Sequence, residues 1–295
     1  MKTAWQPQVA KKPSMPEEPE LVVIVPVHNE AAALEAFDRE LNRHLLQGGV
    51  SAQVLYVEDG STDGSDEVLR NMGANTLSVG ANRGYGAAIK LGVRHTRAPW
   101  IAIIDADATY DPADLVRLWE LRASQDMMVG QRPREKGVRR LAKGLLHAVG
   151  SYAVDYPIPD INSGLRIFRR EVIEKLVGLL PNGFSLTTTI TLGALYTPYR
   201  VCYLPVAYRK RVGHSKLRPV RALNQFILLL LRTMVLWAPL KFFIPPSLVF
   251  AAVGLGFLCR DLLADDVAQV SILMLINAFM LFSLGLLAEA IRVRD

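Results

Sequence analysis

The sequence predicts an α/β domain with a mostly parallel sheet and flanking helices, followed by an interfacial helix and two transmembrane helices. Three observations lead to this fold class. Short apolar runs alternate with amphipathic stretches in the first half of the chain, acidic residues follow several runs, and two long uncharged runs lie near the C-terminus. Apolar runs without polar alternation are typical of strands buried on both faces of a parallel sheet.

The first half of the chain divides into strands and helices at these runs. The expected strands are Leu21–Val27, Gln53–Val57, Thr76–Val79, Trp100–Ile104 and Met127–Val129. The expected helices are Glu30–Leu46, Ser65–Met72, Gly84–Thr96 and Pro112–Arg122. From Gln131 to Pro219 proline and glycine interrupt the periodicity, so we expect helices and loops that complete the site. Residues 21–219 would form one domain.

The N-terminal segment 1–20 carries prolines among polar residues and has no apolar run. It predicts a disordered tail without a signal peptide, so the folded part would begin in the cytosol. Cys202 and Cys259 are the only cysteines, which excludes a disulfide framework and a cysteine-based zinc site.

The C-terminal region is predicted to lie in a membrane. Segment 220–241 reads as an interfacial amphipathic helix, while 242–259 and 267–288 contain no charged residue. At about 1.5 Å per residue, the first run reaches roughly 27 Å, close to a bilayer core. Pro245 and Pro246 would fit its first turn. The alternative is a pair of buried helices in a soluble protein.

Basic residues flank this pair of helices on one side. Arg232 and Lys241 precede the first run, and Arg292 and Arg294 follow the second. Basic flanks stay in the cytosol, so both termini and the folded domain should face that side.

The formal net charge of +6 is unevenly distributed. No carboxylate lies between Glu174 and Asp261, whereas lysines and arginines recur there. This stretch leads into the predicted membrane helices, so its basic residues could attract the membrane surface or could face phosphate groups. We expect no nucleic acid partner.

Asp105-Ala106-Asp107 ends an apolar run and is the strongest candidate for chemistry. Carboxylates two residues apart on a strand converge where the chain turns, and there they can share Mg²⁺ or Mn²⁺. The alternative is a solvated acidic turn.

Other strand ends carry groups that suit a nucleotide. Asp59 follows one run, and Pro26 with Asn29-Glu30 ends the first. A strand-end carboxylate accepts hydrogen bonds from a base or ribose, although Asp59 could instead cap a helix. Gly84-Tyr85-Gly86 opens a helix whose N–H groups could meet phosphate, or it forms a purely structural loop.

Together these segments resemble the successive motifs of family 2 glycosyltransferases with the GT-A fold. The motifs are Val22-Val-Ile-Val-Pro-Val-His-Asn-Glu30, Glu58-Asp-Gly-Ser-Thr-Asp63, Asn82-Arg-Gly-Tyr-Gly-Ala-Ala88 and Asp105-Ala-Asp107. More narrowly, the chain resembles the dolichyl/polyprenyl-phosphate mannose and glucose synthase group over Leu21 to Pro219. The two-helix anchor is also similar to that of polyprenyl-phosphate glycosyltransferases.

The resemblance implies a role for each matching position. The donor would contact Pro26, His28, Glu30, Asp59, Asp105, Ala106, Asp107, Lys210, Arg211 and Lys216. The metal ligands would be Asp105, Asp107 and Thr109, and the acceptor phosphate would meet Arg132, Arg139 and Arg140. The residues closest to the reaction would be Asp107, Arg132 and Arg211. Asn162-Ser-Gly-Leu-Arg166 matches the group's Ser-Gly-x-Arg segment.

Three departures leave the donor sugar and its base open. His28 stands where an aromatic residue is frequent, and Thr109 stands where glutamine is common in the mannose synthases. The basic loop Arg211–Lys216 appears one residue shorter, so Lys210 and Arg211 compete for one role.

The acceptor is inferred from a missing acid. A hydroxyl acceptor needs a general base, and in the polysaccharide synthases that this chain resembles that acid lies well after the metal motif. The corresponding stretch here, Asn182–Thr191, contains no carboxylate. A lipid phosphate is already an anion and needs cations instead. We therefore expect the protein to transfer a sugar from a UDP- or GDP-sugar to polyprenyl phosphate, with inversion at the anomeric carbon. The protein would lie in a membrane, and a homo-oligomer is possible. The alternatives are a hydroxyl acceptor with Asp155 or Asp160 as base, and an inactive nucleotide-binding membrane subunit.

Overall fold

The computed structural model describes residues 19–133, 139–183, 185–209, 228–229, 231–263 and 269–294, with side chains for all of these except 139–143 and 294. The chain divides into two units. One comprises Met1–His147 with Ile158–Leu217, and the other comprises Ala148–Pro157 with Arg218–Asp295.

The first unit contains every strand, and its elements follow the apolar runs of the sequence. The strands are β1 (Leu21–Val27), β2 (Ala52–Glu58), β3 (Thr76–Ser78), β4 (Trp100–Ile103), β5 (Met127–Gln131), β6 (Arg166–Arg169) and β7 (Val201–Pro205). The described helices that precede β7 are α1 (Ala31–Gln47), α2 (Ser65–Asn71), α3 (Tyr85–His95), α4 (Pro112–Trp119), α5 (Arg139–Val154), α6 (Arg170–Leu176) and α7 (Leu186–Tyr196), with a short 3₁₀ turn, η1 (Glu120–Ala123).

The strands form one seven-stranded sheet in the order β3-β2-β1-β4-β6-β5-β7. All neighbouring pairs are parallel except those of β6, which runs antiparallel to β4 and β5. The five predicted strands and four predicted helices are confirmed to within a few residues. The prediction of only helices and loops after Gln131 is wrong, because it misses β6 and β7.

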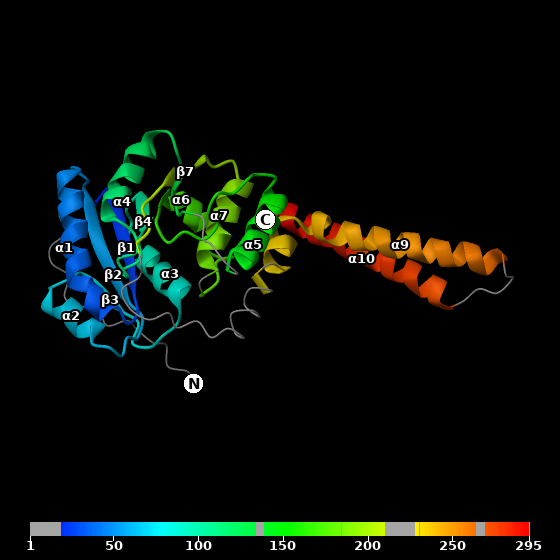
Figure 1. Cartoon of the computed structure of the whole chain (residues 1–295), viewed down its shortest axis with the longest axis horizontal. Helices are drawn as coiled ribbons and strands as arrows, with labels where there is room; N and C mark the ends of the chain where they lie inside the picture. The colour runs from blue at the N-terminus through cyan, green and yellow to red at the C-terminus, as the bar shows by residue number, and fades with distance from the viewer. Residues whose placement is uncertain are drawn as a thin grey trace. The chain divides into compact units, whose positions relative to one another are not determined.

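Both faces of the sheet are covered. On one face, alternate β1 side chains pack with apolar residues of α1 and α4 in a single core cluster. On the other face, Ile24 points at Gly92 of α3, where an added Cβ would come within 2.9 Å of the isoleucine side chain. Figure 1 shows these helices beside the labelled strands. A sheet buried on both sides presents its polar groups at the strand ends.

The second unit contains a helical hairpin of α9 (Pro239–Leu263) and α10 (Gln269–Arg294), which run side by side in Figure 1. Both are long and apolar enough to cross a membrane, with mean hydropathies of 2.0 and 2.3. Their contacts include a hydrogen bond of 3.0 Å from Ser247 Oγ to the Ala278 carbonyl. At the connector, Ser271 Oγ donates to the buried Asp261 carboxylate at 2.8 Å. These bonds satisfy polar groups within the hairpin.

The hairpin extends beyond the predicted runs 242–259 and 267–288. Because α9 already begins at Pro239, Pro245 and Pro246 lie inside the helix, and placing them in its first turn was wrong. Of the predicted interfacial helix 220–241, residues 231–237 are helical, and 220–227 lie outside the described residues.

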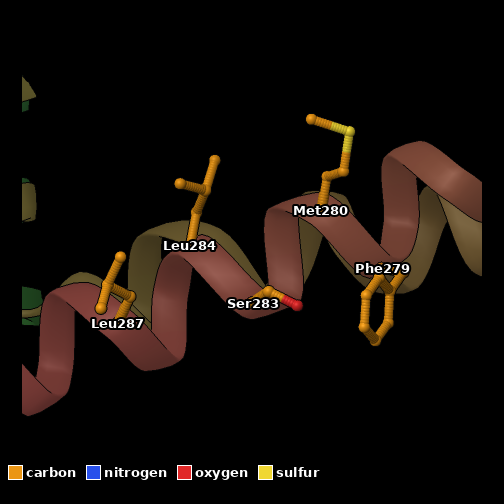
Figure 2. Close-up of a pocket in the computed structure, with 5 residues that line it drawn as sticks. All are labelled: Phe279, Met280, Ser283, Leu284 and Leu287. Atoms are coloured by element: carbon orange, nitrogen blue, oxygen red, sulfur yellow. The ribbon is translucent and has the colours of Figure 1, made fainter.

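A shallow apolar groove lies on α10, lined by Phe279, Met280, Ser283, Leu284 and Leu287 (Figure 2). The lining contains no charged side chain. This groove therefore suits lipid tails and not phosphate groups.

Candidate functional site

The ends of β1 and β2 bring His28 next to Asp59. Val27 pairs with Glu58 in the parallel register, so the next residues of both strands leave the sheet together. His28 Nδ1 lies 2.9 Å from the Asp59 carbonyl, and its Nε2 lies 2.9 Å from Asn82 Nδ2. A carbonyl can only accept, so Nδ1 carries the proton and Nε2 accepts from the amide. His28 thus links three loops.

Asp59 holds the loop before α3. Its two carboxylate oxygens accept from the backbone N–H groups of Arg83 and Gly84, both at 2.8 Å. The side chain is buried, with 3% of the residue exposed. A carboxylate has further lone pairs, so contact with a nucleotide stays a prediction.

The N-terminus of α3 is occupied by the protein itself. Besides the two bonds to Asp59, the Ala87 N–H donates to the Asn182 carbonyl at 3.1 Å. A Cβ on Gly86 would lie 2.3 Å from the Pro181 carbonyl oxygen. Of the two interpretations of Gly84-Tyr85-Gly86, this packing favours the structural loop over a phosphate cradle.

The loop after Asp59 fastens the beginning of α1, a role that the sequence reasoning missed. Ser61 and Ser65 accept from the backbone N–H groups of Asn29 and Glu30 at 3.0 and 2.9 Å. Asp63 accepts from the Ala31 N–H at 3.1 Å. Hydrogen bonds from Ser65 and the backbone lower the pKa of Asp63, although burial alone would raise it. The Ser-Thr-Asp composition was the available signal, since these residues favour helix N-termini.

Asp105 lies just beyond β4 and is held from two sides. The Tyr85 hydroxyl donates to Asp105 Oδ1 at 3.0 Å. Burial, followed by the negative charge of Asp105, raises the pKa of Tyr85 well above 10.0, so this phenol remains a donor. On the other side, a Cβ on Gly164 would lie 2.0 Å from Asp105 Oδ2. Only glycine leaves room for the carboxylate there.

Asp107 lies at the expected turn, and the next residue, Ala108, has a positive φ of 56 degrees. Asp107 Oδ1 accepts from the Thr109 N–H at 3.1 Å and from the Thr109 hydroxyl at 2.6 Å. Both residues are largely buried. The turn thus presents two carboxylates and a hydroxyl, an all-oxygen donor set that suits a hard divalent cation.

Arg132 follows β5 and forms a two-pronged ion pair with Asp160. Nε and Nη2 each lie 2.8 Å from a carboxylate oxygen, and Nη2 also donates to Asn162 at 2.7 Å. Burial would raise the pKa of Asp160, but the hydrogen bonds and charge of Arg132 outweigh it and lower the pKa. Among the described residues, no hydrogen bond reaches Nη1 of Arg132.

Arg166, in the Ser-Gly-Leu-Arg segment, is completely buried and has a structural set of partners. Its guanidinium donates to the carbonyls of Ser163 and Thr187 and to the Thr191 hydroxyl. It therefore ties the beginning of β6 to α7, and it has no exposed surface with which to meet a substrate.

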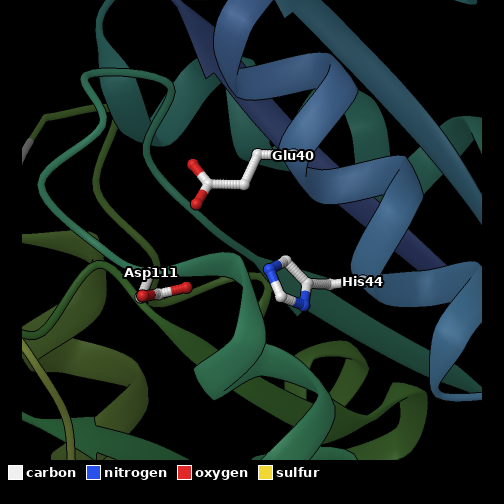
Figure 3. Close-up of side chains that lie close together, drawn as sticks. All are labelled: Glu40, His44 and Asp111. Atoms are coloured by element: carbon white, nitrogen blue, oxygen red, sulfur yellow. The ribbon is translucent and has the colours of Figure 1, made fainter.

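A second group of potential ligands consists of Glu40, His44 and Asp111 (Figure 3). Arg209 already supplies a cation there, with Nη2 2.6 Å from Asp111 and Nη1 3.5 Å from Glu40. We interpret the group as an ion-pair cluster, because a bound metal would have to displace the arginine.

The remaining predicted positions are only partly described. Pro26 lies in β1, Ala106 is buried between the two aspartates, and Glu30 precedes α1. Arg139 and Arg140 begin α5, but their side chains lie outside the description, as do Lys210, Arg211 and Lys216 entirely. The structure thus groups the residues at the ends of β1, β2 and β4 but does not test the basic loop.

A mostly parallel sheet with acidic residues at these strand ends defines the GT-A class of fold. Residues 22–177, more than half of the chain, match the model of glycosyl transferase family 2, and residues 238–292 match the GtrB C-terminal hairpin. The chain belongs to glycosyl transferase family 2.

Three known proteins are similar to this chain. Glycosyltransferase AglJ of Haloferax volcanii is 25% identical over 295 residues, covering 94% of this chain and 95% of that protein. Undecaprenyl-phosphate 4-deoxy-4-formamido-L-arabinose transferase of Pseudomonas aeruginosa is 29% identical, covering 68% of this chain and 61% of the relative. Glucosyl-3-phosphoglycerate synthase of Mycobacterium tuberculosis, solved with Mn²⁺, UDP and phosphoglyceric acid, shares the fold with a TM-score of 0.59 and 20% identity, covering 73% of this chain and 78% of the solved one.

Proposed function

We propose that this protein transfers a sugar from a nucleotide-sugar donor to a polyprenyl phosphate, with inversion at the anomeric carbon. The observation that carries the proposal is the oxygen-donor turn after β4, where Tyr85 and Thr109 orient Asp105 and Asp107. The membrane-capable hairpin and the undecaprenyl-phosphate substrate in the Pseudomonas relative's name support the lipid acceptor.

A divalent cation fits the residues present. Asp105 and Asp107, with Thr109 beside them, would hold Mg²⁺ or Mn²⁺, and the Mycobacterium structure contains Mn²⁺ with UDP. When bound, such an ion neutralises part of the charge on the diphosphate of the donor. The chain's own residues set the direction of both carboxylates before any ion binds.

The donor nucleotide would lie along the ends of β1 and β2. Pro26, His28, Glu30 and Asp59 are at this edge, and Ala106 lies between the metal-holding aspartates. His28 is fixed by its bonds to Asp59 and Asn82. The edge is therefore ordered by protein hydrogen bonds, as expected for a nucleotide site at the carboxyl ends of parallel strands.

The acceptor follows from the state of the two candidate bases. Asp160 is committed to Arg132, which lowers its pKa and makes it a poor proton acceptor. Asp155 lies in the second unit and pairs with Lys241 at 2.6 Å. Both carboxylates are already paired with a cation, whereas an ionised phosphate acceptor needs no deprotonation.

The reaction then requires one bond to form and one to break. An oxygen of the polyprenyl phosphate attacks the anomeric carbon, and the bond from this carbon to the diphosphate breaks with its electron pair on the leaving group. Arg132, with Arg139 and Arg140, would bind the acceptor phosphate. Lys210, Arg211 and Lys216 would stabilise the departing nucleoside diphosphate.

The test is a screen of UDP- and GDP-sugars against polyprenyl phosphate with full-length protein in detergent. We expect one donor to give a polyprenyl-phosphate sugar, identified by mass spectrometry, together with free nucleoside diphosphate. Transfer only to a non-phosphorylated lipid would favour the hydroxyl acceptor. Nucleotide binding without turnover on any acceptor would indicate an inactive subunit.

A further inference from the structure

We propose that Tyr208 is a positioning residue for the acceptor phosphate. Its ring supports the Arg132 guanidinium, and its contact with Tyr110 fixes that arginine relative to the metal-binding turn. The inference rests on the proposed function, because it concerns the acceptor half of the same site.

Tyr208 and Arg132 form a stacked pair. The guanidinium carbon lies 5.6 Å from the centre of the Tyr208 ring, within the range of a cation–π contact. Asp160 and Asn162 hold the edge of the same guanidinium. A planar cation held along its edge and supported by a ring has one preferred orientation. Tyr208 itself is 41% exposed, so its ring is accessible at the surface of the site.

Tyr208 is joined to the turn after the metal motif. Its ring lies 5.2 Å from that of Tyr110, at 71 degrees, and the two residues form an isolated antiparallel bridge. The next residue, Arg209, donates its N–H to the Thr109 carbonyl at 2.8 Å. Backbone and side-chain contacts therefore fix Tyr208 against the segment that contains Thr109.

Tyr110 continues this connection toward Asp105. Its hydroxyl accepts from the Gly164 N–H at 2.8 Å and lies 3.2 Å from Ser163 Oγ. Gly164 in turn packs directly on the Asp105 carboxylate. One continuous set of contacts thus runs from Arg132 through both tyrosine rings to Asp105.

The experiment measures two ligands separately on the full-length protein in detergent. Isothermal titration calorimetry measures the affinity for a short-chain prenyl phosphate. A second titration measures the affinity for nucleoside diphosphate in the presence of Mn²⁺. For Tyr208→Leu we expect prenyl phosphate affinity to fall about five- to tenfold, with nucleotide affinity within about twofold of wild type. Tyr208→Phe keeps the ring and should bind prenyl phosphate within about twofold of wild type.

Tyr199→Leu is a matched control, because it also removes a tyrosine ring that supports a cation: the Lys175 ammonium lies 5.1 Å from the centre of the Tyr199 ring. Tyr199 precedes β7, whereas Tyr208 follows it. It should leave prenyl phosphate affinity unchanged. If Tyr208→Leu fails to fold, Tyr208→Met replaces it, since this change also removes the ring and should cause the same selective weakening.

Unchanged prenyl phosphate affinity in Tyr208→Leu, or in Tyr208→Met as its replacement, would overturn the inference while leaving the proposed function intact. A parallel loss of nucleotide affinity would also overturn it, because a general structural defect would then explain both. A wild-type protein that binds nucleotide but no prenyl phosphate would overturn the proposed acceptor and this inference with it.

Discussion

At Asp105, the partly buried hydroxyl group of Tyr85 and the backbone of Gly164 both contact one carboxylate. Tyr85 donates to one oxygen, and Gly164 leaves space for the other. A carboxylate held this way is oriented before a ligand arrives, which is the arrangement expected of a preorganised site. Small changes at Tyr85 or Gly164 should therefore alter the metal dependence of sugar transfer more than they alter the stability of the fold.

Gly164→Ala tests the space beside Asp105. The added methyl would lie 2.0 Å from Oδ2, so the carboxylate must move. A displacement of about 1 Å at a reacting site can cost roughly a hundredfold in rate, and we expect a loss of this order in sugar transfer. Gly144→Ala is the control, because a Cβ there meets nothing within 4 Å. Equal activity of the two variants would contradict the account.

Tyr85→Phe tests the hydrogen bond to Asp105. Losing one such bond costs about 1 kcal/mol, so roughly fivefold more Mn²⁺ should be needed for half-maximal transfer. Tyr56→Phe removes a comparable buried hydroxyl, bonded to Asp38 at 2.7 Å and distant in sequence from the metal motif. That control should keep the wild-type Mn²⁺ dependence, and a shift in both variants would point to a general loss of stability.

Residue by residue, the sequence predicts positions better than partners. Asp59, Asp105 and Asp107 are at the strand ends where the apolar runs place them. The bonds from Arg83 and Gly84 to Asp59 depend on the fold of a later loop, and the pairing of Arg132 with Asp160 joins residues 28 positions apart. Local pattern contains no information about such distant partners.

At the scale of elements, β6 separates what could be predicted from what could not. The first five strands are apolar runs bounded by turns, and each was found. The sequence of β6, Arg-Ile-Phe-Arg, is short and charged at both ends, and β7 ends in proline. Both are strands because neighbouring strands pair with them, which is a tertiary effect.

Asp126 links these late strands and gives a pH prediction. It accepts from Arg169 Nε at 3.1 Å and from the Arg200 N–H at 2.9 Å. Burial alone would raise its pKa, but the bonds and charges of Arg200 and Arg169 lower it below 3.8. Because the pKa of Asp126 is lower in the folded state than in the unfolded state, the ionised carboxylate stabilises the fold at pH values above the unfolded-state pKa. This stabilisation is lost as the pH falls through the folded-state pKa.

Asp126→Asn should therefore lower the melting temperature near neutral pH and flatten its fall on acidification. Thermal unfolding between about pH 2 and pH 7 measures this. Asp66→Asn, which removes an exposed pair with Arg70, should change little. A wild-type acid dependence in the Asp126→Asn protein would show that this cluster does not contribute.

For the whole molecule, the hairpin makes this a membrane protein, and the basic flanks predict its orientation. Cys259 lies near the connector end of α9 and is exposed, whereas Cys202 belongs to β7. If both termini are cytosolic, Cys259 lies toward the opposite side.

In a Cys202→Ser background, a membrane-impermeant maleimide added outside intact cells should label Cys259. In the Cys259→Ser protein, Cys202 should be labelled only after the membrane is opened. The reverse pattern would place the transferase domain outside the cytosol and contradict the proposed orientation.

The proposed reaction depends on Asp107, which together with Asp105 would hold the donor diphosphate through a divalent cation. The most direct measurement compares wild type with Asp107→Ala in sugar transfer to polyprenyl phosphate, with the lipid product quantified by mass spectrometry. We expect a loss of about a hundred- to a thousandfold that added Mn²⁺ does not restore. Undiminished transfer by Asp107→Ala would contradict it.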